Sequence, residues 1–344
     1  MRKSIKIEMT TIEKWARSTN YERRMIAAEL PIPGVILEKL AKDESCRVRW
    51  TVALNPNTPV GALKRLAEDE DPSVRRNVVC NAKLPENILG KLAKSDFDEG
   101  VRENATERIG SLKILDELSS DESAAIRGAV ARNPKAPKKV LARLAKDSSR
   151  SIREDVAKNP NVQEDVLEGL ADDESKFVRV AVASRSTNPE ILAKLVKDES
   201  EIVRMEVLEN ANLQEELLKE LASDKSANVR IAVAYNTKNS EIFAKLANDK
   251  NEEVRAAVAK NTEDLKLIVE LSRDYSEEVR SNVVDNYRTP VDLLVELAKD
   301  DSECVRAFVA SNKAIPKKVC RKLAKDSSEW VRDSAERQLG KQWW

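Results

Sequence analysis

Residues 55–80 read Asn-Pro-Asn-Thr-Pro-Val-Gly-Ala-Leu-Lys-Arg-Leu-Ala-Glu-Asp-Glu-Asp-Pro-Ser-Val-Arg-Arg-Asn-Val-Val-Cys, and related stretches recur every 25 to 27 residues along the 344-residue chain. The shared pattern is Leu-Ala-x-Asp-x-Ser-x-x-Val-Arg-x-x-Val-Ala-x-Asn. A fixed period of this size indicates stacked supersecondary units and not a globular enzyme domain. Twelve copies carry the arginine of this pattern, at Arg49, Arg75, Arg102, Arg127, Arg153, Arg179, Arg204, Arg230, Arg255, Arg280, Arg306 and Arg332.

The first half of the repeat predicts a short helix. In residues 55–80, Thr58 is a good N-cap residue and Pro59 suits the first helical position. Leu63, Leu66 and Ala67 then follow at helical spacing. This spacing predicts a helix of roughly nine residues with one apolar face.

The second half of the repeat predicts another short helix after a turn. Asp71 is a second N-cap residue, Pro72 follows it, and Val74 and Val78 form an apolar stripe. Asn81 is expected to end this helix, because Asn tolerates the left-handed conformation that a helix terminus often needs.

The residue that caps the second helix is Ser, Asp or Asn in every repeat. Each of these side chains is able to accept a hydrogen bond from the helix N–H groups, worth about 1 kcal/mol. Helices this short are not stable alone, so burial against neighbouring repeats must also hold them. The twelve cap residues are Ser45, Asp71, Asp98, Ser123, Ser149, Ser175, Ser200, Ser226, Asn251, Ser276, Ser302 and Ser328.

The sequence therefore predicts an all-α fold, a superhelical solenoid of about twelve to thirteen short two-helix repeats. A leucine at one position of the first helix is expected to form part of a continuous buried layer. It recurs at Leu40, Leu66, Leu92, Leu118, Leu144, Leu170, Leu195, Leu221, Leu246, Leu271, Leu297 and Leu323.

Each repeated arginine has an aspartate six residues before it. A row of twelve arginines is one way to contact phosphates, one per repeat. The strict pairing favours a structural ladder within and between repeats, because a guanidinium group bonds carboxylate and backbone oxygens in a fixed fork. Representative members of this ladder are Asp69, Arg75, Asp147, Arg153, Asp224 and Arg230.

The Asp…Val-Arg pairing resembles that of HEAT and armadillo-type helical repeats. The pattern Asn-Pro-x-x-Pro-x-x-x-Leu-x-x-Leu-Ala-x-Asp-x-x-x-x-Val-Arg, seen at 55–75 and 133–153, is similar to the leucine-rich repeat variant family. The resemblance covers residues 23–338 and implies a right-handed superhelix with the second helix of each repeat on the concave face. One type of family member carries an N-terminal iron–sulfur cluster, but this chain lacks the cysteine cluster, so no cofactor is expected.

Composition argues against several kinds of chemistry. The chain has 60 Lys+Arg, 60 Asp+Glu and no His. The zero formal charge argues against a polyanion-coating protein, and the missing His removes the usual general base and metal ligand. The four cysteines show no metal-site spacing. We therefore expect no catalytic, cofactor-binding or metal-binding residues. An enzyme would need a carboxylate site, and no Asp or Glu stands out.

Targeting signals are also missing from the sequence. The first residues contain no apolar core of signal-peptide length, and no run of 18 apolar residues occurs. Sparse, unpatterned cysteines fit a reducing compartment. The expectation is a cytoplasmic protein without a membrane partner.

The first unit of the array is degenerate. Residues 23–42 resemble a repeat in which Arg23 is in register and Arg17 replaces the aspartate. Terminal repeats must cover an otherwise open core, so we expect this region to belong to a capping structure.

The resulting domain prediction has three parts: an N-terminal cap over residues 1–22, a single solenoid over residues 23–338 and a C-terminal tail over residues 339–344. Trp343 and Trp344 in the tail have two interpretations. They either cap the core or stay disordered, or they dock a partner.

The third unit departs from the pattern. Gly100, Gly110 and the loss of the Asn-Pro signal predict a local change in helix ends or a bend. Because Asp96 and Arg102 keep their spacing, no domain boundary is expected there.

In the middle repeats, three positions of the second helix become apolar: one before the Val, one after the Arg and five after the Arg. Such a stripe is able to receive a partner helix or peptide. The alternative is packing between neighbouring helices, which is favoured for the β-branched residues. The stripe comprises Phe177, Val180, Ile202, Met205, Ile231 and Tyr235, of which Phe177, Met205, Ile231 and Tyr235 are the candidate partner-binding residues.

Two clusters of cations also stand out. Lys at a helix N-terminus opposes the helix dipole, so local stability does not explain them. They are either solvated surface, which zero net charge favours, or phosphate-binding residues. The first cluster is Lys135, Lys138, Lys139, Arg143, Lys146 and Arg150, and the second is Lys313, Lys317, Lys318, Arg321, Lys322 and Lys325. The candidate phosphate contacts are Lys135, Lys138, Lys139, Lys317 and Lys318.

The leading functional hypothesis is a non-catalytic interaction scaffold that binds a protein or peptide along the concave face. The alternative is a nucleic-acid-binding protein, similar to HEAT-like DNA-repair glycosylases, that uses the basic patches around Lys138 and Lys317. The sequence does not identify the partner.

Overall fold

The computed structural model describes residues 9–340, and within that range it contains 26 α-helices and no strand. The helices form thirteen consecutive pairs, which confirms the all-α helical solenoid predicted from the period. The chain divides into two compact units, residues 1–182 and 183–344, and the boundary falls inside α14. The hand of the superhelix stays a prediction.

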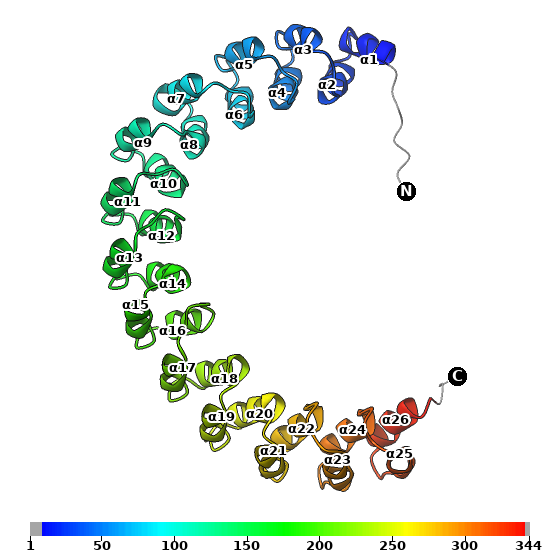
Figure 1. The fold of residues 1–344 in the computed structure, drawn as a ribbon. Helices are drawn as coiled ribbons and strands as arrows, with labels where there is room; N and C mark the ends of the chain where they lie inside the picture. The colour runs from blue at the N-terminus through cyan, green and yellow to red at the C-terminus, as the bar shows by residue number, and fades with distance from the viewer. Residues whose placement is uncertain (1–8, 341–344) are drawn as a thin grey trace. The chain divides into compact units, whose positions relative to one another are not determined.

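In the first unit, odd-numbered helices lie on the outer side of the curve and even-numbered helices on the inner side (Figure 1). The odd-numbered helices are α1 (Met9–Ala16), α3 (Gly34–Leu40), α5 (Val60–Leu66), α7 (Glu86–Ser95), α9 (Leu112–Leu118), α11 (Lys138–Leu144) and α13 (Glu164–Leu170). The even-numbered helices are α2 (Tyr21–Glu29), α4 (Cys46–Leu54), α6 (Pro72–Cys80), α8 (Glu99–Arg108), α10 (Ala124–Arg132), α12 (Arg150–Lys158) and α14 (Lys176–Arg185).

The second unit has the same two-row arrangement (Figure 1). Its odd-numbered helices are α15 (Pro189–Leu195), α17 (Glu215–Leu221), α19 (Ser240–Leu246), α21 (Leu265–Leu271), α23 (Val291–Leu297) and α25 (Lys317–Leu323). Its even-numbered helices are α16 (Glu201–Leu208), α18 (Ala227–Asn236), α20 (Glu252–Asn261), α22 (Glu277–Asp285), α24 (Glu303–Ser311) and α26 (Glu329–Gln338). In each unit we call the exposed side chains of these helices the odd-row and even-row surfaces.

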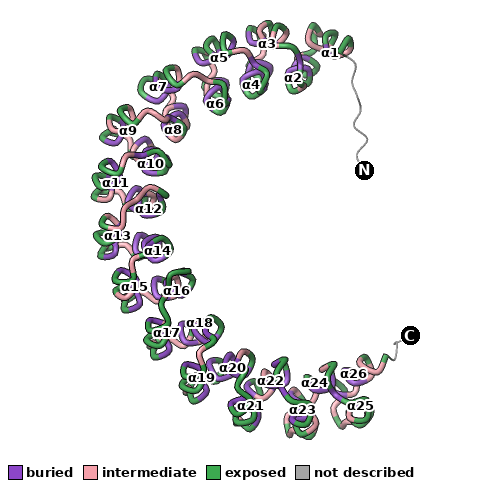
Figure 2. The backbone as a smooth tube through the Cα atoms, viewed as in Figure 1, coloured by how far each residue is buried: buried purple, intermediate pink, exposed green. Residues whose placement is uncertain are grey.

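Both rows contribute to the core, and buried segments occur on the odd and the even helices (Figure 2). Leu63 and Leu66 of α5 are 0% and 1% exposed, and Val74 and Val78 of α6 are both 0% exposed. Neither helix is long enough to be stable in isolation. Packing of these apolar residues between the rows therefore holds each repeat in place.

The first helix of the repeat starts later than the sequence suggested. Helix α5 has seven residues, and Pro59 precedes it without a side-chain capping bond. The prediction that Thr58 is an N-cap is wrong. Its side chain is fully buried, and its hydroxyl donates to the carbonyl oxygen of Val52 at 2.5 Å. Thr58 thus ties the loop back to the preceding helix.

Side-chain capping of the second helix is less general than expected. Side-chain caps form at Asp71, Asp98, Ser123, Asn251 and Ser302. No side-chain cap forms at Ser45, Ser149, Ser200, Ser226, Ser276 or Ser328.

The aspartate two residues before each cap residue organises the turn in every repeat. Its Oδ1 accepts the backbone N–H of the cap residue at 2.7–3.0 Å in all twelve repeats. This bond has the geometry of an Asx turn, in which a side-chain carboxylate replaces a backbone acceptor. The chain therefore enters the second helix correctly even where the cap hydroxyl makes no bond.

The asparagine that ends the second helix does not adopt the left-handed conformation. Asn81 is extended, with φ −77° and ψ 124°, and no described residue other than glycine has a positive φ. Asn81 instead donates from Nδ2 to the carbonyl oxygens of Ala53 and Asn55 in the preceding repeat, at 2.8 and 3.0 Å. Asn159 makes the same pair of bonds, to Ala131 and Asn133. The asparagine is a stacking residue between repeats.

The register at the N-terminal end differs from the prediction. Arg24, and not Arg23, makes the bonds of a repeat arginine. It donates to Asp43 at 2.6 and 3.0 Å and to the carbonyl oxygens of Ser18 and Thr19. Ser18 therefore stands where other repeats have the aspartate, and its carbonyl oxygen is sufficient for this contact. Trp343 and Trp344 lie outside the described residues.

Candidate interaction surfaces

The repeat arginine joins consecutive repeats through a fork of hydrogen bonds. Arg153 donates from Nε and Nη2 to the carboxylate of Asp173 in the following repeat, at 2.6 and 3.0 Å. Its Nη1 donates to the carbonyl oxygen of Asp147 in its own repeat at 2.9 Å. Arg153 is 8% exposed. The guanidinium group thus binds a carboxylate and a backbone oxygen at once.

The aspartate and arginine of one repeat are therefore joined through the main chain, and not through their two charges. Arg75 donates to the carbonyl oxygen of Asp69, and Arg230 to that of Asp224, both at 2.7 Å. The carboxylates of these aspartates accept from the preceding arginines, Arg49 and Arg204. The carboxylate of Asp147 likewise accepts from Arg127.

Arginine–aspartate ion pairs of this kind join consecutive repeats in both units. They include Arg24–Asp43, Arg49–Asp69, Arg75–Asp96, Arg127–Asp147, Arg153–Asp173, Arg204–Asp224, Arg230–Asp249, Arg255–Asp274, Arg280–Asp300 and Arg306–Asp326. We call this set the ladder. Because its charges are paired and largely buried, the ladder does not present a row of free cations.

The ladder perturbs the titration of its carboxylates. The hydrogen bond from Arg127 holds the pKa of Asp147 below its usual value. The hydrogen bond from Arg306 does the same to the pKa of Asp326. An opposite charge and a directed hydrogen bond both favour the ionised carboxylate. These aspartates therefore remain charged at neutral pH.

The junction between α8 and α10 lacks a complete rung. Arg102 donates to the carbonyl oxygen of Asp96 at 2.7 Å, as a repeat arginine should. Among residues 9–340, however, no ion pair joins it to Asp121. At the opposite end of α8, in the loop that leads to α9, Glu86 accepts the N–H groups of Gly110 and Ser111, at 2.7 and 2.9 Å. The predicted irregularity of this unit thus corresponds to different bonds between repeats.

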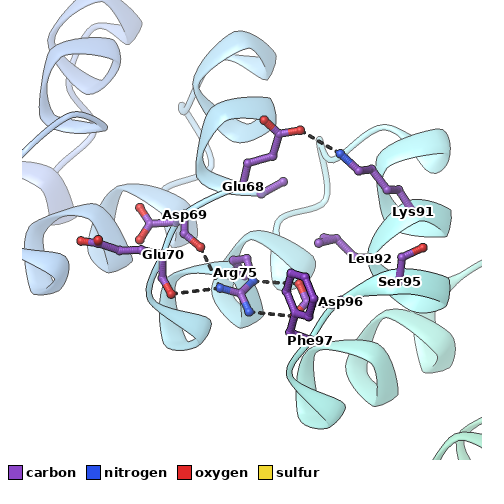
Figure 3. A pocket seen from close by; sticks show the side chains of 10 residues that line it. Glu68, Asp69, Glu70, Arg75, Lys91, Leu92, Ser95, Asp96 and Phe97 are labelled. Carbon is purple, nitrogen blue, oxygen red and sulfur yellow. Dashed lines mark hydrogen bonds and ion pairs between the residues drawn. The ribbon is translucent and has the colours of Figure 1, made fainter.

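A cavity of about 400 Å³ lies beside one rung of the ladder, between the α5–α6 turn and the α7–α8 turn (Figure 3). The Arg75–Asp96 pair and the Glu68–Lys91 pair both line it. Phe97 at its rim is 100% exposed. These charged side chains are paired with one another, so the group in this cavity that is most accessible to a ligand is the aromatic ring of Phe97.

The predicted apolar stripe is divided between the two units. Phe177 lies in the first unit and is 45% exposed. The guanidinium carbon of Arg150 lies 4.9 Å from the centre of its ring, a cation–π distance. In the second unit Tyr235 is 54% exposed, whereas Met205 and Ile231 are half-buried. The second unit thus places Met205 on α16, and Ile231 and Tyr235 on α18.

Exposed aromatic residues show an asymmetry that the sequence reading missed. Within the described helices, every aromatic side chain that is largely exposed lies on an even-numbered helix. Exposed large apolar residues on α3 to α25 of the odd row are Val or Leu only. The aromatic set is Trp50, Phe177, Tyr235, Phe308 and Trp330. These residues form a set only when the structure shows that their helices lie in the same row.

Trp50 borders a cavity of about 280 Å³ on the even row of the first unit. The same cavity is lined by Met25 of α2, by Cys46 and Arg47 of α4 and by Val74 of α6. Trp50 is 41% exposed. An apolar hollow with a tryptophan at its wall is a typical place for an anchoring side chain of a partner.

The two basic clusters differ in how their charges are compensated. In the first, Lys139 and Arg143 form ion pairs with Asp116 at 2.5 and 2.9 Å. Lys135 and Lys138 are exposed. Lys317 and Lys318 of the second cluster are also exposed, and neither forms an ion pair with a described residue.

Residues 9–340 contain no group of three or more Cys, Asp or Glu side chains arranged to hold a metal ion. Over the same residues, no helix is long and apolar enough to cross a membrane.

One repeat of the chain matches a known family of repeats. Residues 47–71 match the family model described as leucine rich repeat variant. No curated protein matches the chain.

Several solved structures are similar to the chain. One is described as a leucine-rich repeat variant with a novel repetitive structural motif. It shares 26% identity, with 68% of this chain and 88% of that chain covered and a TM-score of 0.47. Kap121p bound to RanGTP shares 11% identity over 96% of this chain and 48% of its own, with a TM-score of 0.44. A Kap95p–RanGDP complex shares 11% identity over 96% of this chain and 60% of its own, with a TM-score of 0.41.

Proposed function

We propose that this chain, whose helical repeats are of the leucine-rich repeat variant and HEAT type, is a non-catalytic scaffold that binds a protein or peptide along its even-row surfaces. The observation that carries the proposal is the restriction of exposed helical aromatics to the even-numbered helices. Trp and Tyr are enriched among the residues that dominate binding energy at protein interfaces.

The chemistry of the repeats supports binding over catalysis. The strictly repeated residues have structural tasks: Leu and Val fill the core, and the arginines and aspartates join neighbouring repeats. Exposed positions vary between repeats, and on the even row they include Trp50, Ile202 and Tyr235, which are between 41% and 54% exposed. A surface that varies on a constant frame is well suited to recognition.

The test compares the even row with the odd row in the second unit. Tyr235→Glu and Met205→Glu each place a charge on the even row, and Leu265→Glu is the matched control on α21, where Leu265 is 48% exposed. Tagged proteins are used to purify partners from nuclease-treated lysate, and the captured proteins are quantified by mass spectrometry. We expect Tyr235→Glu to reduce capture of a stoichiometric partner by about 30-fold, as for loss of an interface residue worth roughly 2 kcal/mol.

The control variant should capture the partner as the wild type does. Equal capture by all three variants, or an equal loss in the Leu265→Glu control, would contradict binding through the even row. If a partner is captured only from lysate that has not been treated with nuclease, the ligand is a nucleic acid and not a protein.

A further inference from the structure

Helix α25 and its neighbouring residues carry a cluster of uncompensated positive charge on the second unit. Residues 313–325, which include α25, carry six cations and no acid, and Asp326 in the following turn is paired with Arg306. All six side chains are exposed, and none forms an ion pair with another described residue. We call these residues the α25 surface: Lys313, Lys317, Lys318, Arg321, Lys322 and Lys325.

Helix α11 serves as an internal comparison for this surface, because it has cations at the corresponding positions. There Lys139 and Arg143 both bind Asp116 of the neighbouring helix α9. Arg143 also donates to the hydroxyl of Ser119. The hydrogen bond from Lys139, followed by that from Arg143, lowers the pKa of Asp116. The α11 cations are thus neutralised by the odd row itself.

The same two acceptors are missing next to α25. A shift of 179 residues brings the two repeats into register and places Lys318 and Lys322 at the positions of Lys139 and Arg143. Under this shift Val295 replaces Asp116, and Ala298 replaces Ser119. Helix α25 therefore has cations at the positions of Lys139 and Arg143 without either of their two acceptors.

This arrangement lowers the stability of the helix. Like charges four residues apart repel each other, as Lys317 and Arg321 or Lys318 and Lys322 must do. Lys317 and Lys318 also lie in the first turn, where the helix dipole disfavours positive charge. The helix dipole favours Arg321 and Lys322 in the last turn, but it gives no reason for Lys317 and Lys318, whereas an external anion does.

We propose that the α25 surface binds the phosphodiester backbone of a nucleic acid. Side chains three or four residues apart on a helix are about 5–6 Å apart at Cβ, so these cations lie next to one another. A duplex carries about one charge per 1.7 Å of axis and therefore offers phosphates to several of these cations at once. Five of the six cations are lysines, which act as point charges. A row of such point charges contacts backbone phosphates without a fixed bidentate geometry. The surface therefore matches a continuous backbone, without base readout.

The experiment uses a matched pair of triple variants in the full chain. Lys317→Gln/Lys318→Gln/Lys322→Gln removes three cations from α25, and Lys138→Gln/Lys139→Gln/Arg143→Gln removes the three corresponding cations from α11. Fluorescence anisotropy measures binding of a labelled 20-base-pair duplex at several salt concentrations, with circular dichroism as the check of folding. A labelled polyglutamate peptide and phosphatidylserine vesicles are the comparison anions.

We expect the wild type to bind the duplex in a salt-dependent manner. The α25 variant should bind about tenfold more weakly or worse, with the slope of log K against log salt reduced by about 2 to 3. The α11 variant should stay within about twofold of the wild type. Absence of duplex binding by the wild type, or an equal loss in both variants, would overturn the proposal. Binding of the peptide or the vesicles in place of the duplex would reject nucleic acid as the ligand.

Discussion

In a complete rung, the aspartate of the turn serves three partners at once. In the case of Asp147, the carboxylate accepts Arg127 from the preceding repeat and the N–H of Ser149 in its own turn. Its carbonyl oxygen accepts Arg153 from its own repeat. One residue therefore closes the turn, starts the second helix and connects two repeats. This multiple use explains why the position is invariant along the chain while its neighbours vary.

The sequence alone predicts that the arginine and the aspartate belong to a ladder, but not which atoms meet. A separation of six residues within one repeat suggests a direct pair between the two charges. The carboxylate in fact reaches an arginine about twenty residues earlier, because stacking brings that turn closer. The misassigned Arg23 and the role of Asn81 have the same origin, since both depend on contacts between repeats.

Removing one ladder arginine tests how much a complete rung stabilises the fold. Arg153→Met leaves the carboxylate of Asp173 without its partner, and breaking a buried pair in this way costs about 3–5 kcal/mol. Arg102→Met is the matched control, because Arg102 has the same position and lacks the ion pair to Asp121. Urea denaturation should show a much larger decrease in the free energy of unfolding for Arg153→Met. Equal decreases for the two variants would show that the ion pair adds little.

At the scale of the element, each turn depends on an ionised carboxylate. This feature predicts how stability changes with pH. Asp147 and Asp326 have pKa values below the ordinary range in the folded chain. The pKa of an aspartate in the unfolded chain is about 3.9. A lowered pKa contributes stability that is present above the unfolded value and is lost as the pH falls through the folded value.

We therefore expect the free energy of unfolding to change little between pH 8 and pH 6, because the chain has no histidine, and to fall below about pH 4. Urea titrations at pH 7, 5 and 3, followed by circular dichroism, measure this. A main loss of stability between pH 7 and pH 5 would contradict the role of the ladder carboxylates.

The helices also show which element properties a sequence can predict. Their number, order and approximate positions follow from period and apolar spacing. Their caps do not, because Ser45 and Ser149 lie at the N-cap position without forming a side-chain bond. The backbone N–H of Ser149 is bound by Asp147. A hydrogen bond that an Asx turn already supplies removes the need for the hydroxyl.

At the scale of the whole molecule, both units combine a recurring frame with exposed residues that vary between repeats. The ladder and the core repeat along both units, while the even row carries the exposed aromatics. The sequence predicted an apolar stripe with Phe177 and Tyr235, but the structure places Arg150 over Phe177. The structure also shows Trp50 beside a cavity on the even row of the first unit, which the sequence did not predict. Trp50 was missed because a single tryptophan becomes part of a surface only when the neighbouring helices α2 and α6 are placed beside it.

Site-specific photocrosslinking tests the central claim most directly. A photoreactive amino acid at position 235 lies on the even row, and the same group at position 265 lies on the odd row of the same unit. After irradiation in nuclease-treated lysate, crosslinked products are identified by mass spectrometry. The account predicts one dominant protein product from position 235 and none from position 265. A dominant product from position 265, with none from position 235, would contradict an even-row scaffold.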